Sequence, residues 1–491
     1  MIDAAAPSRL SLSALPTLRR VGVPRYVRGD LSPGIVHFGV GNFHRAHQAA
    51  HLDALMNRGL ARDWAIVGAG VTPHDGAMRE ALAGQDWLTT LVEQSAEAVE
   101  ARVIGPMVDF LPVGDVAATV ARLADPATRI VSLTVTEGGY FLDASGAFDA
   151  DHPAIRADAA APDAPRTVFG LILAGLRARR GAGLQPFTVM CCDNIPHNGG
   201  VTRNAVAGLA RLGDAGFADW VEAEVAFPDA MVDRITPATG ERERRLCRER
   251  HGVDDAWPVF CEDFTQWVIE DRFPLGRPPL EQAGVLFTPD VGTWELMKLR
   301  ILNGGHAAIA YPGGLLGIEF VHEAMAEPLI AGYLEKLTRE EIIPVTPTPP
   351  GQSLEAYRAL IASRFANPAI GDTVRRLCLD GSNRQPKFIV PAVRDRLAAG
   401  APVEGLALVS ALWRRYCAGR DETGGAIAPN DPRWESLSAL AARPDPLDWL
   451  GMGEVYGEVG RAAPFRDAFA RWAARIEVEG VRSALSGWLR G

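Results

Sequence analysis

The chain has 491 residues and a formal net charge of -10, with 47% hydrophobic and 22% charged residues. This length predicts two or three domains, and the acidic balance without a Lys/Arg run argues against nucleic-acid or anionic-membrane partners. Six dispersed cysteines, an N-terminus without a secretory apolar segment and no run of about 20 apolar residues predict a cytoplasmic protein with reduced thiols.

The first 290 residues alternate short apolar runs with helical patterns. Residues 220–237 also look extended. Strands that alternate with helices predict a parallel sheet, so we expect an α/β, Rossmann-type domain over residues 1–290. The expected strands are 34–41, 63–71, 129–139 and 186–194, and the expected helices are 44–59 and 168–179.

A glycine turn follows the first predicted strand, in "HFGVGNFHRAH". Glycines there let backbone N–H groups approach a dinucleotide pyrophosphate at a helix N-terminus. The G-x-G-x-x-G pattern is incomplete because His44 occupies the third glycine position, so a turn without a ligand remains an alternative. The candidate cofactor residues of this turn are Gly39, Gly41, Asn42, Phe43 and Arg45, the last to offset phosphate charge.

The second predicted strand ends at "GAGVTPHD". An acid after this strand usually binds the adenosine ribose hydroxyls, and Asp75 is the candidate. It lies further from the glycines than the usual spacing of about 20 residues, so the signal is moderate.

The helix after the glycine turn carries His44, His47 and His51 on one face. Histidines three or four residues apart can bind zinc, which leaves a metal-dependent hydrolase or lyase as an alternative class. No cysteine or clear carboxylate completes a ligand set, so we expect no metal and a face that contacts cofactor or solvent.

From about residue 291 long helical patterns dominate, with a proline-rich linker at 343–351. We therefore expect a mostly α-helical second domain over residues 291–491. Its first helix contains "MKLRILNGGHAAIAY", in which polar residues interrupt an aliphatic stretch. On an α-helix, Glu295, Lys298, Asn303 and His306 would share an arc of about 140°. A solvated stripe would explain any one of them, but four together favour a cleft.

Oxidation of a secondary alcohol needs a base for its hydroxyl proton. A lysine whose pKa is lowered by burial can serve without a metal, and asparagine amides can stabilise the developing alkoxide. Lys298 and Asn303 fit these roles. Asn194 follows the strand predicted at 186–194, at the kind of strand end where catalytic groups gather.

Six motifs together resemble the long-chain, metal-independent polyol dehydrogenases, with the mannitol dehydrogenases the nearest. They occur in the family's order and cover roughly residues 30 to 480. They are "IVHFGVGNFHRAHQAAHLDALMNRG", "SLTVTEGGY", "VMCCDNIPHNGGVTRNAV", "FCEDFTQWVIED", "KLRILNGGHAAIAY" and "RRLCLDGSNRQPKF".

The resemblance implies an NAD-dependent enzyme that converts mannitol or a related alditol to the 2-ketose, and the reverse. Its catalytic residues map onto Lys298 as the general base, Asn194 and Asn303 as holders of the reacting oxygen, His306 as a substrate-orienting group and Glu295 as a proton relay. Its substrate contacts map onto Asp233 and Arg376, while Arg384 replaces a lysine that we associate with the mannitol enzymes. This departure concerns the preferred polyol more than the reaction type.

An acidic pair that favours NAD over NADP aligns with His74–Asp75, which reduces the expected discrimination. Family members are often monomers, although the sequence leaves the oligomeric state open. It also leaves open the preferred alditol, with arabinitol, sorbitol or a hexuronate as alternatives within the family. A non-catalytic nucleotide sensor is a further class, which the complete lysine, asparagine and histidine set disfavours.

Overall fold

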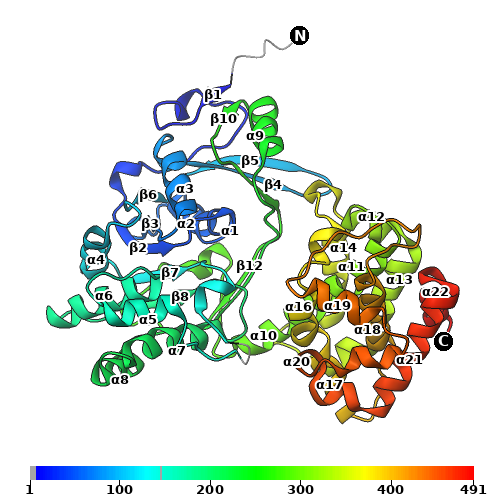
Figure 1. Cartoon of the computed structure of the whole chain (residues 1–491). Helices are drawn as coiled ribbons and strands as arrows, with labels where there is room; N and C mark the ends of the chain where they lie inside the picture. The colour runs from blue at the N-terminus through cyan, green and yellow to red at the C-terminus, as the bar shows by residue number, and fades with distance from the viewer. Residues whose placement is uncertain (1–6, 144–145) are drawn as a thin grey trace, which may run out of the picture. The chain divides into compact units, whose positions relative to one another are not determined.

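The structure, a computed structural model, describes residues 7–143 and 146–491 (Figure 1). The chain divides into two compact units, one ending at Gly292 and the other running from Thr293 to Gly491. Each unit has its own regular elements.

The N-terminal unit is built on a five-stranded parallel sheet of order β6-β3-β2-β7-β8. The strand order reverses between β2 and β7, which places a crevice at their carboxyl ends, where dinucleotides bind in such sheets. The strands are β2 (Pro33–Phe38), β3 (Ala65–Ala69), β6 (Met107–Phe110), β7 (Ile130–Leu133) and β8 (Thr188–Cys191).

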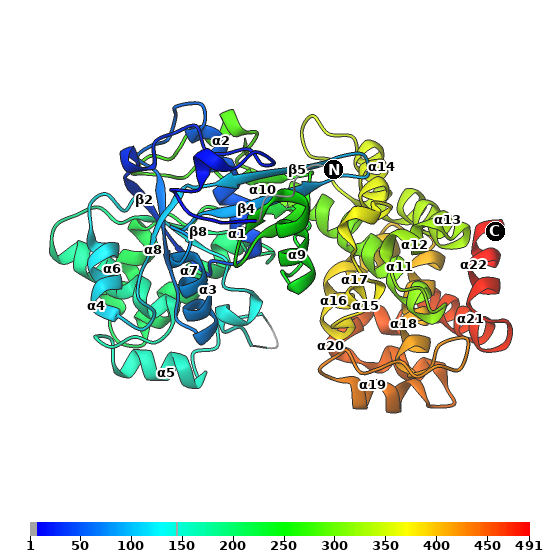
Figure 2. The same ribbon diagram turned by 90° about the horizontal axis from the view of Figure 1, so that it is seen from above.

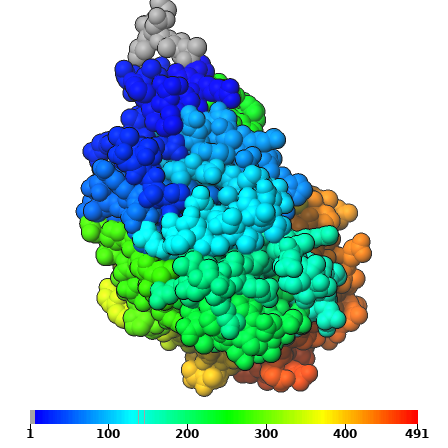
Figure 3. Space-filling model, turned by 90° about the vertical axis from the view of Figure 1, so that its left-hand side faces the viewer, coloured from blue at the N-terminus to red at the C-terminus, as the bar shows by residue number. Residues whose placement is uncertain are grey.

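Both faces of this sheet are buried because alternate residues of its strands enter two separate cores. Val36 and Phe38 pack with residues of α4, α6 and α7, whereas Ile35 packs with residues of α2. The chain from α4 to α8, cyan to green, lies on the surface seen in Figure 3. The helices are α1 (Asn42–Ala46), α2 (Gln48–Met56), α3 (Pro73–Ala83), α4 (Val116–Ala124), α5 (Pro153–Ala160), α6 (Val168–Gly181), α7 (Asn198–Arg211), α8 (Ala215–Glu224) and α9 (Glu241–Leu246).

Three smaller sheets extend this unit, with orders β11-β4-β5, β13-β12-β9 and β1-β10. Strands β4 and β5 form an antiparallel hairpin (Figures 1 and 2). The strands are β1 (Ser8–Arg9), β4 (Thr89–Gln94), β5 (Val99–Ile104), β9 (Ala230–Asp233), β10 (Val253–Asp254), β11 (Val259–Glu262), β12 (Gln266–Ile269) and β13 (Leu286–Phe287).

The C-terminal unit is built from helices (Figure 2), and α10 (Val291–Met297) runs across the boundary between the units. A π-helical segment, η6 (Lys298–Asn303), continues α10 directly into α11 (Gly304–Leu315). The later helices are α12 (Val321–Ala326), α13 (Pro328–Leu337), α14 (Leu354–Phe365), α15 (Val374–Leu377), α16 (Gly381–Phe388), α17 (Val390–Ala398), α18 (Glu404–Cys417), α19 (Trp434–Ala441), α20 (Gly453–Tyr456), α21 (Ala463–Glu479) and α22 (Val481–Arg490).

The predicted fold class is confirmed: a parallel α/β sheet followed by a mostly helical part. The extended reading of residues 220–237 is wrong at its start, because α8 continues to Glu224 and only β9 is a strand. The helix expected over 44–59 is two helices, since His47 between α1 and α2 leaves the helical region. Among the described residues no helix is both long and apolar enough to cross a membrane.

Candidate active site

A cleft of about 560 Å³ opens in the N-terminal unit at the carboxyl ends of β2, β3 and β7. It lies at the reversal of strand order, where the sequence predicted a dinucleotide. Its lining includes three backbone segments, 39–41, 70–72 and 134–136, together with His74, Asp75, Phe141, Arg166 and Thr167.

The glycine turn has the form that a pyrophosphate requires. Gly39 has φ +89°, and a Cβ on it would lie 2.1 Å from the carbonyl oxygen of Thr134, so only glycine fits there. Gly41 is the N-cap of α1, and its Cβ position is open apart from the Gly39 carbonyl oxygen at 3.7 Å. A ligand can therefore approach the backbone closely at Gly41, and the turn fits NAD.

The polar side chains Asn42 and Arg45 of α1 form hydrogen bonds within the N-terminal unit. Asn42 donates to the carbonyl oxygen of Pro237 and to Thr239 Oγ1, each at 2.9 Å. Arg45 is buried and donates to the Gly41 and Trp257 carbonyl oxygens, among others. Burial lowers the pKa of Arg45 to about 10. Its direct contact with a phosphate stays a prediction, while its observed bonds hold the turn in shape.

Asp75 lines the cleft but also caps α3. Its Oδ2 accepts hydrogen bonds from the Val71 N–H at 3.0 Å and from the Thr72 N–H at 2.8 Å and Oγ1 at 2.7 Å. The capping box fixes this carboxylate at the end of β3, and the predicted ribose contact remains untested. Its neighbour His74 contacts Trp257 edge-on.

The histidine face packs α1 and α2 against the rest of the unit. His44 stacks on His37 at 3.5 Å, His47 Nε2 lies 3.2 Å from the Gln266 carbonyl oxygen, and His51 Nδ1 lies 3.0 Å from that of Ala283. The part of the chain that the structure describes contains no group of three or more His, Cys, Asp or Glu side chains placed to hold a metal ion. The metal-dependent hydrolase hypothesis therefore lacks its ligand cluster.

Two predicted residues of this unit lie at strand ends. Asn194 is exposed, just beyond β8, and its neighbour Asp193 ties this end to the loop after β7. Asp193 accepts hydrogen bonds from the N–H groups of Val135 and Thr136 at 2.9 and 3.0 Å and from the Tyr140 hydroxyl at 2.6 Å. We did not single out Asp193 from the sequence, although "CCDN" places it at a strand end. Asp233 ends β9 and is buried.

In the C-terminal unit, Lys298 begins the π-helical segment and is 6% exposed. The assumption of an α-helical wheel is therefore wrong over Lys298–Asn303. In a π-helix the hydrogen bonds run from residue i to i+5, so residues five apart lie one turn above each other. The π geometry brings Lys298 and Asn303 onto one face, closer than an α-helix would. Glu295, in the preceding turn, is half-buried.

Asn303 and His306 each keep a buried polar atom without a hydrogen-bond partner in the described residues. These atoms are Asn303 Oδ1 and His306 Nε2. The His306 ring stacks on Phe365, with centroids 4.3 Å apart. Buried polar atoms are usually satisfied, so these two atoms are available to hydrogen-bond a ligand.

The basic residues predicted for this unit act electrostatically on His306. Burial, and then nearby positive charge, lowers the pKa of His306 well below its ordinary value, so the imidazole is neutral. The charges are, in order of effect, Arg376, Arg384, Arg364 and Lys298. Three predicted residues thus lie near a fourth, and the buried Arg364 is one that the sequence did not reveal.

Arg376 and Arg384 are both held by local contacts. Arg376 forms a two-pronged pair with the Asp372 carboxylate. Arg384 donates to the Leu377 carbonyl oxygen at 2.9 Å, from helix α16. The guanidinium groups are therefore positioned before any ligand binds.

Comparison with known proteins agrees with this geometry. The family model of the mannitol dehydrogenase Rossmann domain matches residues 33–282, and that of the mannitol dehydrogenase C-terminal domain matches residues 290–476. The mannitol 2-dehydrogenase of Cereibacter sphaeroides is 58% identical over 474 residues, which cover 96% of this chain and 99% of that protein.

Two solved structures match almost the full length. The Pseudomonas fluorescens mannitol 2-dehydrogenase ternary complex with NAD and D-mannitol is 44% identical, with a TM-score of 0.90, over 98% of this chain and 100% of that one. A D-sorbitol dehydrogenase in substrate-free form is 37% identical, with a TM-score of 0.89, over 97% and 100%. With both family models matched, the chain belongs to the mannitol dehydrogenase family.

Proposed function

We propose that this protein oxidises D-mannitol at its second carbon to D-fructose with NAD, and catalyses the reverse reduction. The observation that carries the proposal is the polar face of Lys298, Asn303 and His306 in the C-terminal unit, in a chain whose other unit has a dinucleotide cleft. The names of the relatives that match over nearly the full length supply the substrate and cofactor.

Lys298 is the general base in this proposal. Its side chain is buried, at 6% exposed, which is the setting in which a lysine can serve as a base. Asn303 offers an amide on the same face for the reacting oxygen, with Asn194 as its proposed partner. Glu295, half-buried one turn earlier, is the proposed route for the proton to solvent.

The remaining residues hold substrate. The neutral His306 can accept or donate a hydrogen bond to the polyol without adding charge, and its buried Nε2 suits that role. Arg376 and Arg384 are proposed to contact polyol hydroxyls, and the same role is proposed for Asp233. NAD, when bound through the turn at Gly39 and Gly41, supplies the acceptor for the hydride.

The first test is NADH formation by the purified protein, followed by absorbance, with NAD and a panel of alditols. We expect turnover of D-mannitol, reduction of D-fructose by NADH in reverse, and no change of rate with a chelator. Failure of every alditol with both NAD and NADP would overturn the proposal, and loss of activity with chelator would overturn the lysine mechanism.

The panel must include D-sorbitol and D-arabinitol. A D-sorbitol dehydrogenase is nearly as similar in fold as the mannitol enzyme, and Arg384 departs from the lysine expected in the mannitol enzymes. Because arginine presents a planar fork and lysine a point charge, this position can change which hydroxyl pattern fits best. A kcat/KM for D-sorbitol above that for D-mannitol would reassign the preferred substrate without changing the reaction.

A further inference from the structure

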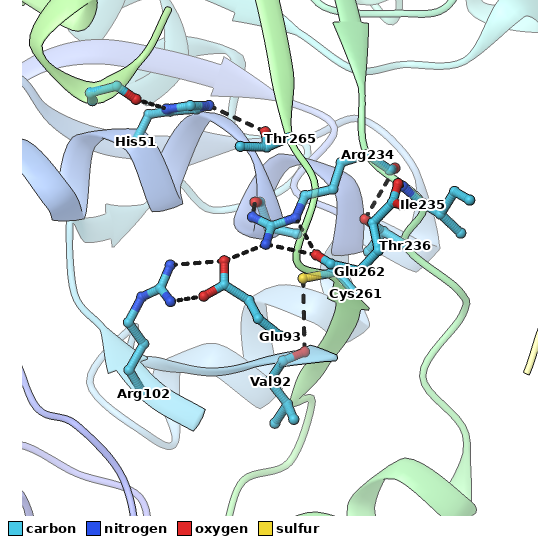
Figure 4. A network of polar contacts seen from close by, with 12 residues as sticks. His51, Val92, Glu93, Arg102, Arg234, Ile235, Thr236, Cys261, Glu262 and Thr265 are labelled. Carbon is cyan, nitrogen blue, oxygen red and sulfur yellow. Dashed lines mark hydrogen bonds and ion pairs between the residues drawn. The ribbon is translucent and has the colours of Figure 1, made fainter. Parts of the chain in front are cut away.

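Arg234 follows the proposed substrate residue Asp233 directly, and its guanidinium is buried in a polar network (Figure 4). Its Nε and Nη2 donate to the Glu262 carbonyl oxygen at 3.0 and 2.9 Å. Its Nη1 donates to the carbonyl oxygen of Ala46, the last residue of α1. Arg234 therefore joins the end of β9 to β11 and to the helix that follows the glycine turn.

The charge of Arg234 is balanced by Glu93 on β4. Glu93 also binds Arg102 of β5, so one carboxylate lies between two guanidinium groups (Figure 4). The Arg234 side chain is 2% exposed, whereas that of Arg102 is 32% exposed. A buried arginine without a carboxylate partner would be strongly destabilising, so Glu93 makes the buried position of Arg234 possible.

The backbone after Asp233 is held from both sides. Glu262 Oε1 accepts the N–H of Ile235, and the Glu262 N–H donates to the Ile235 carbonyl oxygen at 3.1 Å. Further along, Asn42 of α1 donates to Pro237 and Thr239. The segment 234–239 is thus fixed to both ends of α1, through Arg234 at Ala46 and through Asn42 at the first residue.

We propose that Arg234 is a positioning residue, which fixes the carboxylate of Asp233 relative to helix α1 and so sets the affinity for the polyol. This inference rests on the proposed function, in which Asp233 binds a substrate hydroxyl. The planar guanidinium of Arg234 carries several donors, and these reach Glu93, Glu262 and Ala46 together. Lysine, with a single ammonium, cannot reproduce all three contacts.

The test is steady-state kinetics of Arg234→Met, with Arg102→Met as the matched control. Both variants remove one guanidinium from Glu93 and leave it the other, but only the first loses the bonds to Ala46 and Glu262. We expect Arg234→Met to raise the KM for the polyol about ten-fold or more, as loss of bonds to a charged group predicts. Arg234→Lys should recover part of this loss, and Arg102→Met should stay within about two-fold of wild type.

Binding of NADH, titrated by its fluorescence, separates positioning from misfolding. Arg234→Met should bind NADH with full stoichiometry, because α1 keeps its bonds through Asn42 and Arg45. An unchanged polyol KM in Arg234→Met, or an equal rise in Arg102→Met, would overturn the inference. A reduced stoichiometry with an unchanged polyol KM would show a purely structural role and would also overturn it.

Asp233→Asn distinguishes the proposed substrate contact of Asp233 from the positioning role of Arg234. If it leaves the polyol KM unchanged, the proposed role of Asp233 is wrong and the inference falls with it. If it raises the KM while Arg234→Met does not, only the positioning inference is wrong. Because Arg234 acts through Asp233, the double variant should have the polyol KM of Asp233→Asn alone, and additive effects would contradict the inference.

Discussion

At the scale of single residues, the choice of lysine at position 298 is informative. The chain has 47 arginines and only three lysines, Lys298, Lys336 and Lys387. Arginine is in effect always protonated and cannot serve as a base, whereas a buried lysine can lose its proton. A lysine at the start of the π-helical segment, in a chain that otherwise uses arginine, fits a position that needs a titrating amine.

Replacement of Lys298 tests this argument. Lys298→Ala should lower kcat by about 10²- to 10⁴-fold, the usual contribution of a general base. Lys298→Arg should be similarly impaired although it keeps the positive charge. In the wild type kcat should rise with pH through the titration of the lysine, and this limb should vanish in both variants.

Lys336→Met is the control, because Lys336 lies on α13 and contacts Trp488 of α22, and neither helix carries a predicted site residue. It should keep kcat within about two-fold of wild type, as expected for a part-buried residue outside the site. With only three lysines, ¹³Cε labelling also gives a spectrum simple enough to titrate Lys298 directly. An activity of Lys298→Arg close to wild type would refute the base assignment.

At the scale of elements, the sequence predicted the sheet well, because buried parallel strands are continuous apolar runs with glycine or polar ends. The prediction failed where a helix signal and a strand signal overlapped, and where two kinds of helix share the same composition. Residues 220–224 are apolar enough for a strand, but Asp214 caps a helix that continues through them. The π-helical form of Lys298–Asn303 was also missed, since local composition does not distinguish i+4 from i+5 hydrogen bonding.

Only those residues of the candidate site that belong to a local sequence pattern could be named in advance. Asn194 could be named from the chain alone because it follows a predicted strand, whereas Asp233 was named only through the family resemblance. Arg234 and Arg364 could not, because their roles come from partners that lie far away in sequence, such as Glu93 for Arg234. Arg45 is the opposite case. The sequence placed this cation beside the glycine turn, but it did not predict the hydrogen bonds to the Gly41 and Trp257 carbonyl oxygens.

Helix α16 is placed by close packing at its first residue, Gly381. A Cβ there would lie 2.4 Å from Trp413 Nε1 and 2.8 Å from the Tyr311 hydroxyl, both buried. Gly381→Ala must displace α16, which carries Arg384, or disturb the core, at a cost of about 1–3 kcal/mol. We expect a Tm lower by roughly 2–10 °C and a higher KM for the polyol.

The control for this substitution is Gly451→Ala in the same unit, because a Cβ on Gly451 would meet no atom within 4 Å. It should change neither the Tm nor the KM measurably. Thermal melting followed by circular dichroism, with kinetics on the same samples, checks both variants. Equal melting of Gly381→Ala and wild type would mean that α16 is not fixed at this point.

At the scale of the whole molecule, buried charge is placed where an opposite charge or a helix end can hold it. In the N-terminal unit Glu93 balances Arg234. In the C-terminal unit, Glu341 accepts the N–H groups of Gly405 and Leu406, both at 2.9 Å, at the start of α18. These bonds favour the ionised form, but burial outweighs them and raises the pKa of Glu341 to about 7.

This shift makes the stability of the folded protein depend on pH. The pKa of Glu341 in the folded protein lies above its unfolded value of 4.5. The contribution of Glu341 to the free energy of unfolding is therefore complete below pH 4.5 and is lost as the pH rises through 7. Glu341→Gln removes the titration. Relative to this variant, the wild type should lose about 3 kcal/mol of unfolding free energy between pH 4.5 and 8, at about 1.4 kcal/mol for each pKa unit.

Thermal melts of both proteins across this range measure the difference. Glu341→Gln should melt close to the wild type at pH 4.5 and several degrees above it at pH 8. Glu340→Gln, one residue earlier and exposed, is the control and should follow the wild type at every pH. A constant difference between Glu341→Gln and wild type across the range would mean that Glu341 is ionised in the folded protein throughout, held by the two N–H groups of α18 despite its burial.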